Sequence, residues 1–286
     1  MKPLFPRARN VEIGHGQRLT LGRRSTLMGI LNVTPDSFSD GGRHATVDRA
    51  VAAALRMVDE GADIIDIGGE STRPGATPVD AIEEQRRVLP VIEALCRHPG
   101  LVLSIDTYRS ETARLAVEAG VHIVNDVFGA QKDHEIAKVA AETGSGLCLM
   151  HTGRERQPLP DVIEDQFLFL RRSLEIATIA GVERNRIILD PGFGFAKDGP
   201  QNMRLMARFD ELLALDHPIL VGTSRKRFVL GSLGRDDPER DVATAATSVL
   251  LRERGADIFR VHNVPANRDA LAIVDAMSAA MAGEVW

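Results

Sequence analysis

Short apolar runs alternate with longer helical patterns along the chain, and a polar or glycine-rich segment separates each run from the next helix. Residues 27–31 form one such run, Leu-Met-Gly-Ile-Leu, which is typical of a buried strand. The segment after it, 32–42, holds a proline, two aspartates, three hydroxyl side chains and a glycine pair. Such residues favour loops over strand interiors. The pattern therefore predicts repeated units of strand, loop and helix.

Eight apolar runs predict strands, and five periodic segments predict helices. The strands are expected at residues 26–31, 64–67, 101–105, 122–125, 146–150, 186–189, 218–221 and 258–261. The helices are expected at residues 47–60, 78–96, 109–119, 161–180 and 242–254. In the first helix, Val47, Val51 and Leu55 share one face. Eight strands separated by helices are what a closed (β/α)8 barrel requires, so the predicted fold class is α/β.

The composition suits a single barrel domain. The chain has 286 residues, near the ~250 typical of barrels that fold as one unit. Hydrophobic residues make up 44% and aromatic residues only 4%, as expected for aliphatic parallel strands buried on both faces. We expect residues 1–286 to form one domain, with 1–25 as an N-terminal extension. Glycines within residues 10–22 favour a short β-hairpin there that covers the bottom of the barrel.

Charge and cysteine content narrow the possible partners. The net charge of -5 argues against a general nucleic-acid binder, which usually carries a basic surface. No apolar stretch approaches the ~20 residues needed to span a membrane. The N-terminal residues lack the apolar core of a signal peptide. Cys96 and Cys148 are expected to be buried thiols in a reducing compartment, which favours a cytoplasmic protein.

Polar side chains follow nearly every predicted strand, whereas the turns at the opposite ends of the strands carry no such clusters. The polar groups include Asn32, Asp40, Glu70, Thr72, Arg73, Asp106, Asn125, Asp126, His151, Asp190, Ser224, Lys226, Arg260 and His262. The turns at the opposite ends are 61–62, 99–100, 120–121, 216–217 and 255–256. Active sites of barrels form at the carboxyl ends of the strands. This asymmetry therefore predicts an active site at that end.

The predicted site has two chemical halves. Two carboxylates and an amide can accept N–H donors from a flat amino-heterocycle: Asp106, Asn125 and Asp190. Four cationic or imidazole groups suit an anion such as a phosphate: Arg73, Lys226, Arg260 and His262. Hydroxyls are added by Thr72 and Ser224, and Asn32 offers an oxygen of the kind that Mg²⁺ accepts. Together these groups suit a substrate that joins a nitrogen-rich ring to a phosphate.

Structural roles are also open for several of these residues. Asp106 and Asp126 could cap helices, Asp36 and Asp40 could be turn residues, and Met150 could belong to the core. The role of His151 stays open. Caps alone would not gather four cationic or imidazole groups at one rim. The chain has no phosphate-binding P-loop, dinucleotide fingerprint, H-E-x-x-H or C-x-x-C pattern.

Seven ordered segments resemble the dihydropteroate synthase family over essentially the full chain. They are residues 28–42, 66–75, 104–107, 124–126, 190–197, 223–226 and 260–262. The resemblance implies a TIM barrel, a homodimer and no nucleic-acid or membrane partner. It also implies a transferase of folate synthesis that condenses 6-hydroxymethyl-7,8-dihydropterin diphosphate with p-aminobenzoate, releasing diphosphate. Sulfonamides, which mimic p-aminobenzoate, are expected to inhibit such an enzyme.

The resemblance also implies a role for each matching residue. The pterin would be bound by Asp106, Asn125, Met150, Asp190 and Lys226. The diphosphate would be engaged by Arg260, His262 and Asn32, with Mg²⁺ at Asn32. The p-aminobenzoate pocket would be framed by Thr72, Arg73, Phe195 and Ser224. Asp40 would reach the reacting centre from a mobile loop, so the catalytic set would be Asp40, Lys226, Arg260 and His262.

Two departures from the family pattern keep rival functions in view. Residues 152–160 form a different, basic segment, and Asn263 replaces an aspartate. A pterin-binding paralogue without catalysis is one alternative. A methyltetrahydrofolate:corrinoid methyltransferase, which shares the pterin-binding groups, is the other. Diphosphate release that depends on Mg²⁺ and p-aminobenzoate would separate all three.

Overall fold

Eight parallel strands form one continuous sheet in the computed structural model, which describes residues 8–34, 43–71, 77–231 and 240–283. The strands are β3 Thr26–Asn32, β4 Ile64–Gly68, β5 Val102–Asp106, β6 Ile123–Asp126, β7 Gly146–Met150, β8 Ile187–Asp190, β9 Leu220–Val221 and β10 Ile258–Val261. Their spatial order is β8-β7-β6-β5-β4-β3-β10-β9. A parallel bridge between Leu189 and Ile219 joins the two end strands. The sheet is therefore closed, and the predicted (β/α)8 barrel is confirmed.

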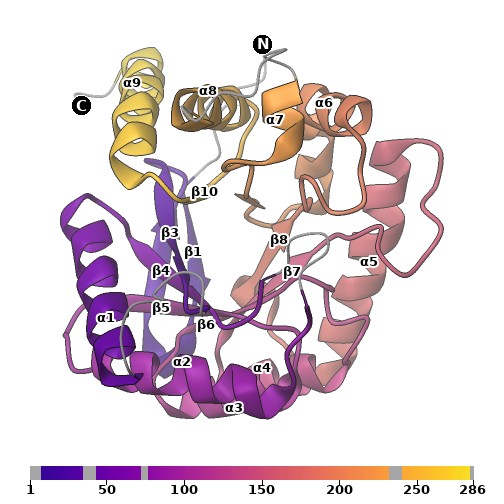
Figure 1. The fold of residues 1–286 in the computed structure, drawn as a ribbon. Coiled ribbons are helices and arrows are strands. Elements are labelled where there is room, and N and C mark those ends of the chain that lie inside the picture. The colour runs from indigo at the N-terminus through magenta and orange to yellow at the C-terminus, as the bar shows by residue number, and fades with distance from the viewer. Residues whose placement is uncertain (1–7, 35–42, 72–76, 232–239, 284–286) are drawn as a thin grey trace.

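Helices surround the strands as an outer ring (Figure 1). The helices are α1 Arg43–Asp59, α2 Ala81–Leu95, α3 Ser110–Glu118, α4 Glu135–Thr143, α5 Val162–Ala180, α6 Gly199–Ala207, α7 Arg227–Gly231, α8 Arg240–Glu253 and α9 Val264–Ala282. Short 3₁₀ turns are η1 Gly14–Gly16, η3 Arg184–Arg186 and η4 Phe209–Leu215. Local sequence fixes several boundaries: the side chain of Asp161 caps α5, and Gly181 ends it at a φ of 92°.

A β-hairpin closes the amino end of the barrel, as predicted. Strand β1, Arg9–Glu12, pairs antiparallel with β2, Arg18–Leu21. The amide of Gly14 donates to the carbonyl of His122, 2.9 Å away, at the start of β6. Apolar hairpin side chains pack into the interior of the barrel, so the hairpin acts as its floor.

Side chains inside the barrel change from apolar to polar along the strand direction. Alternate residues of a strand face the interior. Near the floor these positions are apolar and buried: Met28, Ile64, Ile123, Cys148, Ile188, Leu220 and Ile258. Two residues further along, the same faces carry Asp66, Asn125, Asp190 and Arg260. The polar side chains therefore gather at the carboxyl ends, while the opposite strand faces pack against the helices.

One thiol prediction is wrong. Cys148 is buried in β7, as expected, but Cys96 is exposed. Cys96 follows the last residue of α2, where the helix ends at the surface. The helices of the described residues are all too short or too polar to cross a membrane. The single-domain organisation of residues 1–286 stays a prediction.

Candidate active site

A largely buried network of ion pairs and hydrogen bonds joins four strands at the carboxyl end of the barrel. Arg260 of β10 donates from Nε to Oδ2 of Asp66, 2.6 Å away, and from Nη2 to Oδ2 of Asp106, 2.7 Å away. Asn125 of β6 donates from Nδ2 to the same Asp66 oxygen at 3.2 Å. These side chains come from positions far apart in sequence, so the barrel brings the predicted carboxylate, amide and guanidinium groups together.

Asp190 and Lys226 extend this polar group across the carboxyl end of the barrel, which we call the mouth. Asp190 ends β8, and its Oδ1 accepts the amide of Gly192 at 2.7 Å. Lys226 follows β9 and donates to the carbonyl of Phe193. A Cβ placed on Gly222 would lie 4.0 Å from the Lys226 ammonium and 3.9 Å from the Arg260 Cβ. Gly222 therefore lies within van der Waals reach of both the Lys226 and the Arg260 side chains.

Burial controls the charges of these groups. It raises the pKa of Asp106 above its usual range, although the guanidinium of Arg260 opposes this shift. Burial also raises the pKa of Asp190, and the Lys226 ammonium opposes that shift. The pKa of Lys226 falls to about 8 through burial, with Asp190 opposing the shift. Burial therefore favours the neutral forms of Asp106, Asp190 and Lys226, and a neighbouring opposite charge favours their ionised forms.

Ser224 and His262 form a hydrogen-bonded pair beside Arg260. The Oγ of Ser224 lies 2.9 Å from Nδ1 of His262 and accepts the His262 amide at 3.1 Å. Ser224 follows β9 and His262 follows β10, which are neighbouring strands. The pair fixes the imidazole at the rim, on the same side of the mouth as the guanidinium.

Asn32 borders a space that only a glycine keeps open. A Cβ added at Gly68 would lie 3.8 Å from Oδ2 of Asp106 and 3.9 Å from Oδ1 of Asn32. Mg²⁺ is usually held by one or two protein oxygens together with waters and substrate phosphates. Within the described residues no three His, Cys, Asp or Glu side chains cluster as a metal cage. Asn32 and its surroundings therefore fit an Mg²⁺ ion that a phosphate-bearing substrate helps to hold.

Two cations flank the ring of Phe195. The Arg154 guanidinium carbon and the Lys226 ammonium each lie 4.6 Å from the ring centroid. Such contacts are favourable because the ring faces carry negative charge. The close approach depends on Gly194, whose φ is 78° and whose added Cβ would lie 2.9 Å from Cδ of Lys226. Arg154 belongs to the divergent basic segment, which therefore borders the mouth.

His151 takes a structural position behind the site. It is buried, its Nε2 lies 2.9 Å from Oδ2 of Asp165, and its Nδ1 accepts a hydrogen bond from Lys197 at 2.8 Å. Arg156 makes hydrogen bonds to both carboxylate oxygens of Asp165. The second arginine of the basic segment therefore ties the segment to α5. These contacts favour a structural role for His151, whose role the sequence left open.

The structure also shows the surroundings of Met150, Asp126 and Asn263. Met150 is buried at the end of β7, facing the interior. Asp126 accepts the amides of Phe128 and Ala130, so it caps its own turn, as predicted. Asn263 is the N-cap of α9 and donates to Asp241 of α8. The departure at residue 263 therefore lies in helix capping rather than in the ion-pair network.

Some predicted site residues fall outside the described ranges. They are Asp36, Asp40, Thr72 and Arg73. The predictions for these residues stay predictions.

The sequence interpretation missed Asp66, Asp165 and Lys197. Asp66 lies inside a strand rather than at its end, so the search of strand ends passed over it. A signal was available, because the alternation Ile64, Asp66, Gly68 places a charge on the interior face of β4. Asp165 lies within a helix and meets His151 only through tertiary packing, so no local pattern marks it.

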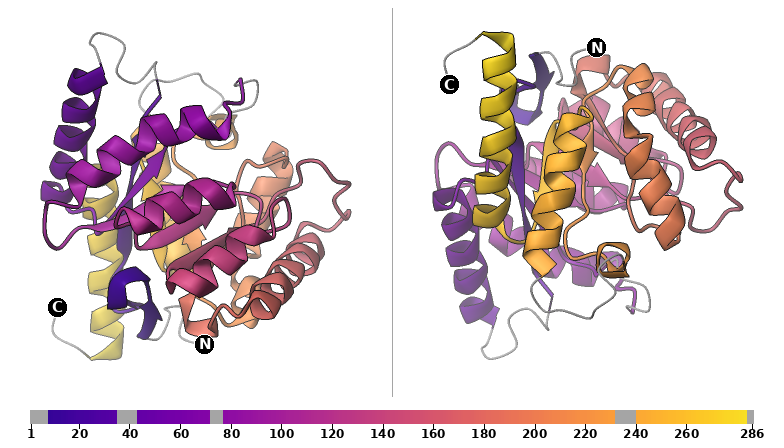
Figure 2. Two further views of the ribbon diagram at one scale, coloured as in Figure 1. Left: turned by 90° about the horizontal axis from the view of Figure 1, so that it is seen from below. Right: turned by 90° about the horizontal axis from the view of Figure 1, so that it is seen from above.

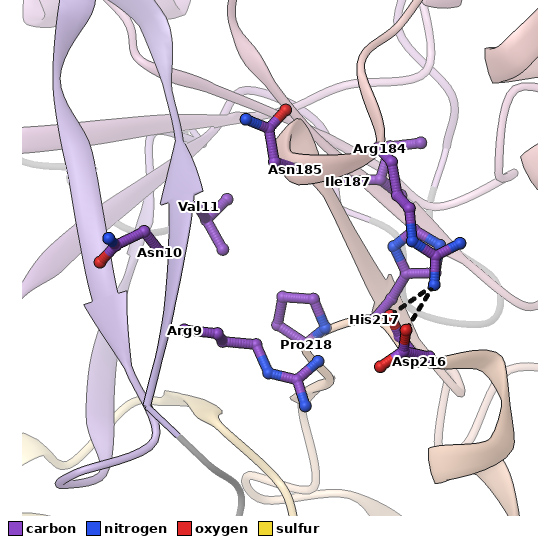
Figure 3. A pocket seen from close by; sticks show the side chains of 9 residues that line it. All are labelled: Arg9, Asn10, Val11, Arg184, Asn185, Ile187, Asp216, His217 and Pro218. Carbon is purple, nitrogen blue, oxygen red and sulfur yellow. Dashed lines mark hydrogen bonds and ion pairs between the residues drawn. The ribbon is translucent and has the colours of Figure 1, made fainter.

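A second hollow lies at the opposite end of the barrel and is not this site. It is a cavity of about 320 Å³ between β1 and the turns before β8 and β9. Figure 3 shows Arg9, Arg184, Asp216 and His217 around it, with Arg184 paired to Asp216. None of the predicted site residues lines it.

Comparisons with known proteins agree with the geometry. A family model described as pterin binding enzyme matches residues 28–262. Dihydropteroate synthase of Bacillus subtilis is 46% identical over 262 residues, covering 91% of this chain and 90% of that protein. The Clostridium difficile enzyme, solved in the presence of pteroic acid, matches with a TM-score of 0.87 at 46% identity, covering 90% of this chain and 98% of that one. The Xanthomonas albilineans enzyme with 4-aminobenzoic acid matches with a TM-score of 0.89 at 43% identity, covering 96% and 99%.

The barrel, its charged mouth and the matched segment define a pterin-binding enzyme. The match covers most of the chain, including all eight barrel strands apart from the first two residues of β3. Within that class the chain belongs to the dihydropteroate synthase family, the transferases of folate biosynthesis.

Proposed function

We propose that the protein condenses 6-hydroxymethyl-7,8-dihydropterin diphosphate with p-aminobenzoate at this mouth, giving 7,8-dihydropteroate and diphosphate. One observation carries the proposal. Arg260 is held between Asp66 and Asp106 at one end of the barrel, with Asp190 and Lys226 at the same opening. Acids suited to a nitrogen-rich ring and cations suited to its phosphate tail therefore share one end of the barrel.

The pterin ring would bind at the deeper, acidic part of the mouth. Asp106, Asn125 and Asp190 offer oxygen acceptors for the N–H groups of the ring. Lys226 supplies a donor for the ring oxygen or nitrogen acceptors. Met150 supplies an apolar, polarisable surface at the end of β7. Pteroic acid, named with the similar Clostridium difficile structure, contains this ring and supports the assignment.

The diphosphate would lie toward Arg260, His262 and Asn32. The guanidinium and the imidazole donate hydrogen bonds to phosphate oxygens, and Asn32 would hold Mg²⁺. When bound, Mg²⁺ supplies positive charge to the diphosphate oxygens. The space above Gly68, bordered by Asn32 and Asp106, supports this assignment.

p-Aminobenzoate would bind beside Phe195, with Ser224 close to its carboxylate end. The aromatic ring of the substrate can pack against Phe195, which lies close to the cations of Arg154 and Lys226. The family motif adds Thr72 and Arg73 to this pocket and Asp40 to the reacting centre. 4-Aminobenzoic acid, named with the similar Xanthomonas albilineans structure, is the substrate expected here. Sulfonamides are expected to compete for the same place.

The proposed reaction depends on charge stabilisation and positioning. Cleavage of the bond between the pterin methylene carbon and the diphosphate oxygen leaves negative charge on the diphosphate. Arg260 and His262 stabilise that charge at the rim. The pterin left behind is positively charged, and Asp106 and Asp190 stabilise it. The amine nitrogen of p-aminobenzoate then bonds to the methylene carbon and loses a proton, and it needs chiefly correct orientation. We expect no covalent intermediate with the enzyme and no strong general base.

We also propose that the protein is a homodimer that pairs through α8 and α9. These helices lie side by side on the outside of the barrel (Figure 2). Ile273, Met277 and Met281 recur every four residues on α9, and Ile273 and Met281 are 73% and 70% exposed. Exposed apolar stripes of this kind favour association. Met277→Glu should convert a dimer to a monomer in sedimentation, whereas a wild-type monomer would contradict the proposal.

A cytoplasmic location is part of the same proposal. Both thiols, Cys96 and Cys148, are free, which is typical of proteins from a reducing compartment. Fractionation of the source cells would test it.

Release of diphosphate is the experiment that tests the proposed function. The purified protein should release diphosphate from the pterin substrate only when both Mg²⁺ and p-aminobenzoate are present. A non-catalytic paralogue would bind the pterin and release none. A methyltransferase would show no dependence on p-aminobenzoate. Either result would contradict the proposal.

A further inference from the structure

Asp66 is the most deeply buried charge of the mouth. It lies at the middle of β4, in register with Ile30 on one side and Ser104 on the other. Its side chain has an exposed fraction of 0%, compared with 9% for Asp106. A ligand entering the mouth can therefore reach Asp106, whereas Asp66 is covered by its neighbours.

Arg260 contacts the two carboxylates through different nitrogens. Its Nε donates to Asp66 at 2.6 Å, and its Nη2 donates to Asp106 at 2.7 Å. The contact with Asp106 can therefore be given up while the contact with Asp66 is kept. A buried guanidinium that lost both partners would be strongly disfavoured.

We propose that Asp66 is a positioning residue that acts as the permanent counter-ion of Arg260. It holds the guanidinium in place while Asp106 exchanges its contact with Arg260 for the N–H donors of the pterin. This inference rests on the proposed function, since it assumes that Asp106 binds the pterin. It adds a residue that touches no substrate atom and yet sets how strongly the ring is bound.

Asn125 depends on the same carboxylate. Its Nδ2 donates to Asp66 Oδ2 at 3.2 Å. Because the two ends of an amide point apart, this bond turns the oxygen of Asn125 away from Asp66 and leaves it for a ligand. Asp66 therefore orients two of the groups assigned to the ring, the guanidinium and the amide.

The opposite side of Asp66 offers a matched control. Oδ1 of Asp66 and Oγ of Ser104 are both buried and have no hydrogen-bond partner among the described residues. Ser104→Ala removes a buried hydroxyl beside Asp66 and leaves the bonds to Arg260 and Asn125 intact. Ser104→Ala therefore reports any effect of disturbing the interior between β4 and β5, because it keeps the Asp66 counter-ion in place.

The first test is Asp66→Asn, which keeps the shape and removes the charge. Isothermal titration with pteroic acid should show affinity weakened by about tenfold or more, because Arg260 then competes with the ring for Asp106. Ser104→Ala should remain within about twofold of wild type. In turnover, the KM for the pterin diphosphate should rise while the KM for p-aminobenzoate changes little. Unchanged affinity in a folded Asp66→Asn protein would overturn the inference.

A double-mutant cycle separates positioning from a general structural role. In an Arg260→Gln background, Asp66→Asn should change the affinity for pteroic acid by less than about twofold, because the partner it serves is gone. An equal loss in both backgrounds would overturn the inference. If Asp66→Asn alone does not fold, the double variant, in which both charges are removed, is compared with Arg260→Gln in the same way. Failure of wild type to bind pteroic acid would reject the proposed function itself, and the inference with it.

Discussion

The ammonium of Lys197 donates a hydrogen bond to Nδ1 of His151 across 2.8 Å, beneath the loop that carries Phe195. Lys197 also donates to the carbonyl of Gly192 at 2.9 Å. On the other side of the ring, Nε2 lies 2.9 Å from both Oδ2 of Asp165 and Nη2 of Arg156. A neutral histidine therefore links α5 to the loop after β8, and this support is sensitive to acid.

Acid should weaken the fold through His151. Burial lowers the pKa of His151 to about 3, with the Lys197 charge adding to the shift. Between that value and the unfolded value of about 6.5, the unfolded chain binds a proton that the folded chain does not, so stability falls as the pH falls. The free energy of unfolding, measured in urea, should fall between pH 7 and pH 5 by about 2 kcal/mol less in His151→Gln than in wild type.

The exposed His98 provides the control for this measurement. His98→Gln should keep the wild-type loss of stability between the two pH values. An equal loss in His151→Gln and wild type would show that His151 does not cause it.

Asp190→Ala should lose most pterin binding. The carboxylate is buried at the end of β8, and loss of its charge-assisted hydrogen bonds to the ring should weaken affinity by about 10- to 100-fold. Titration calorimetry with pteroic acid measures this directly. Asp198→Ala is the control, because it removes the N-cap of α6 from the same loop. That variant should lose stability but keep pterin affinity, and wild-type affinity in Asp190→Ala would refute the role given to Asp190.

Phe195→Leu should weaken binding of the second substrate. Leucine keeps apolar bulk but loses the aromatic faces that lie 4.6 Å from Arg154 and Lys226. The KM for p-aminobenzoate should rise by about tenfold, while the KM for the pterin diphosphate stays within about twofold. The control is Phe167→Leu on α5, which removes an aromatic ring that lies 5.1 Å from a different cation, Arg171. Equal effects in both variants would argue against the assignment.

Removal of Mg²⁺ should stop diphosphate release without preventing binding of pteroic acid, which has no diphosphate. Asn32→Ala should raise the Mg²⁺ concentration needed for half-maximal activity by about tenfold or more. Asn185→Ala, at the opposite end of the barrel, is the control and should leave that concentration unchanged. Full activity in a chelator would rule out a role for the ion.

The barrel could be predicted because its strands are apolar runs of the right length. Strands β7 Gly146–Met150 and β10 Ile258–Val261 begin and end at the predicted residues. Strand β9 was predicted two residues too long at its start, since Pro218 lacks an amide for the ladder. Helix α2 begins at Ala81 rather than residue 78, because Asp80 serves as the N-cap.

The site could be predicted only where function lies at strand ends. Asp106, Asn125, Asp190 and Arg260 do meet at one mouth, as the pattern implied. The partner that organises them, Asp66, is set by which face of β4 points inward, and strand ends alone do not reveal it. Helices α4, α6 and α9 also escaped prediction. Length does not explain this, because α3 has nine residues and was predicted whereas α9 has 19 and was not.

The most direct test of the central claim is to follow ¹⁵N-labelled p-aminobenzoate into product. The claim is that the acids and cations of one mouth act on one molecule, so that its ring is held while its phosphate tail departs. Mass spectrometry should detect labelled dihydropteroate in a one-to-one ratio with released diphosphate, and Asp190→Ala and Arg260→Gln should each greatly reduce both. Diphosphate released without labelled product, or labelled product that both variants still form at the wild-type rate, would contradict the account.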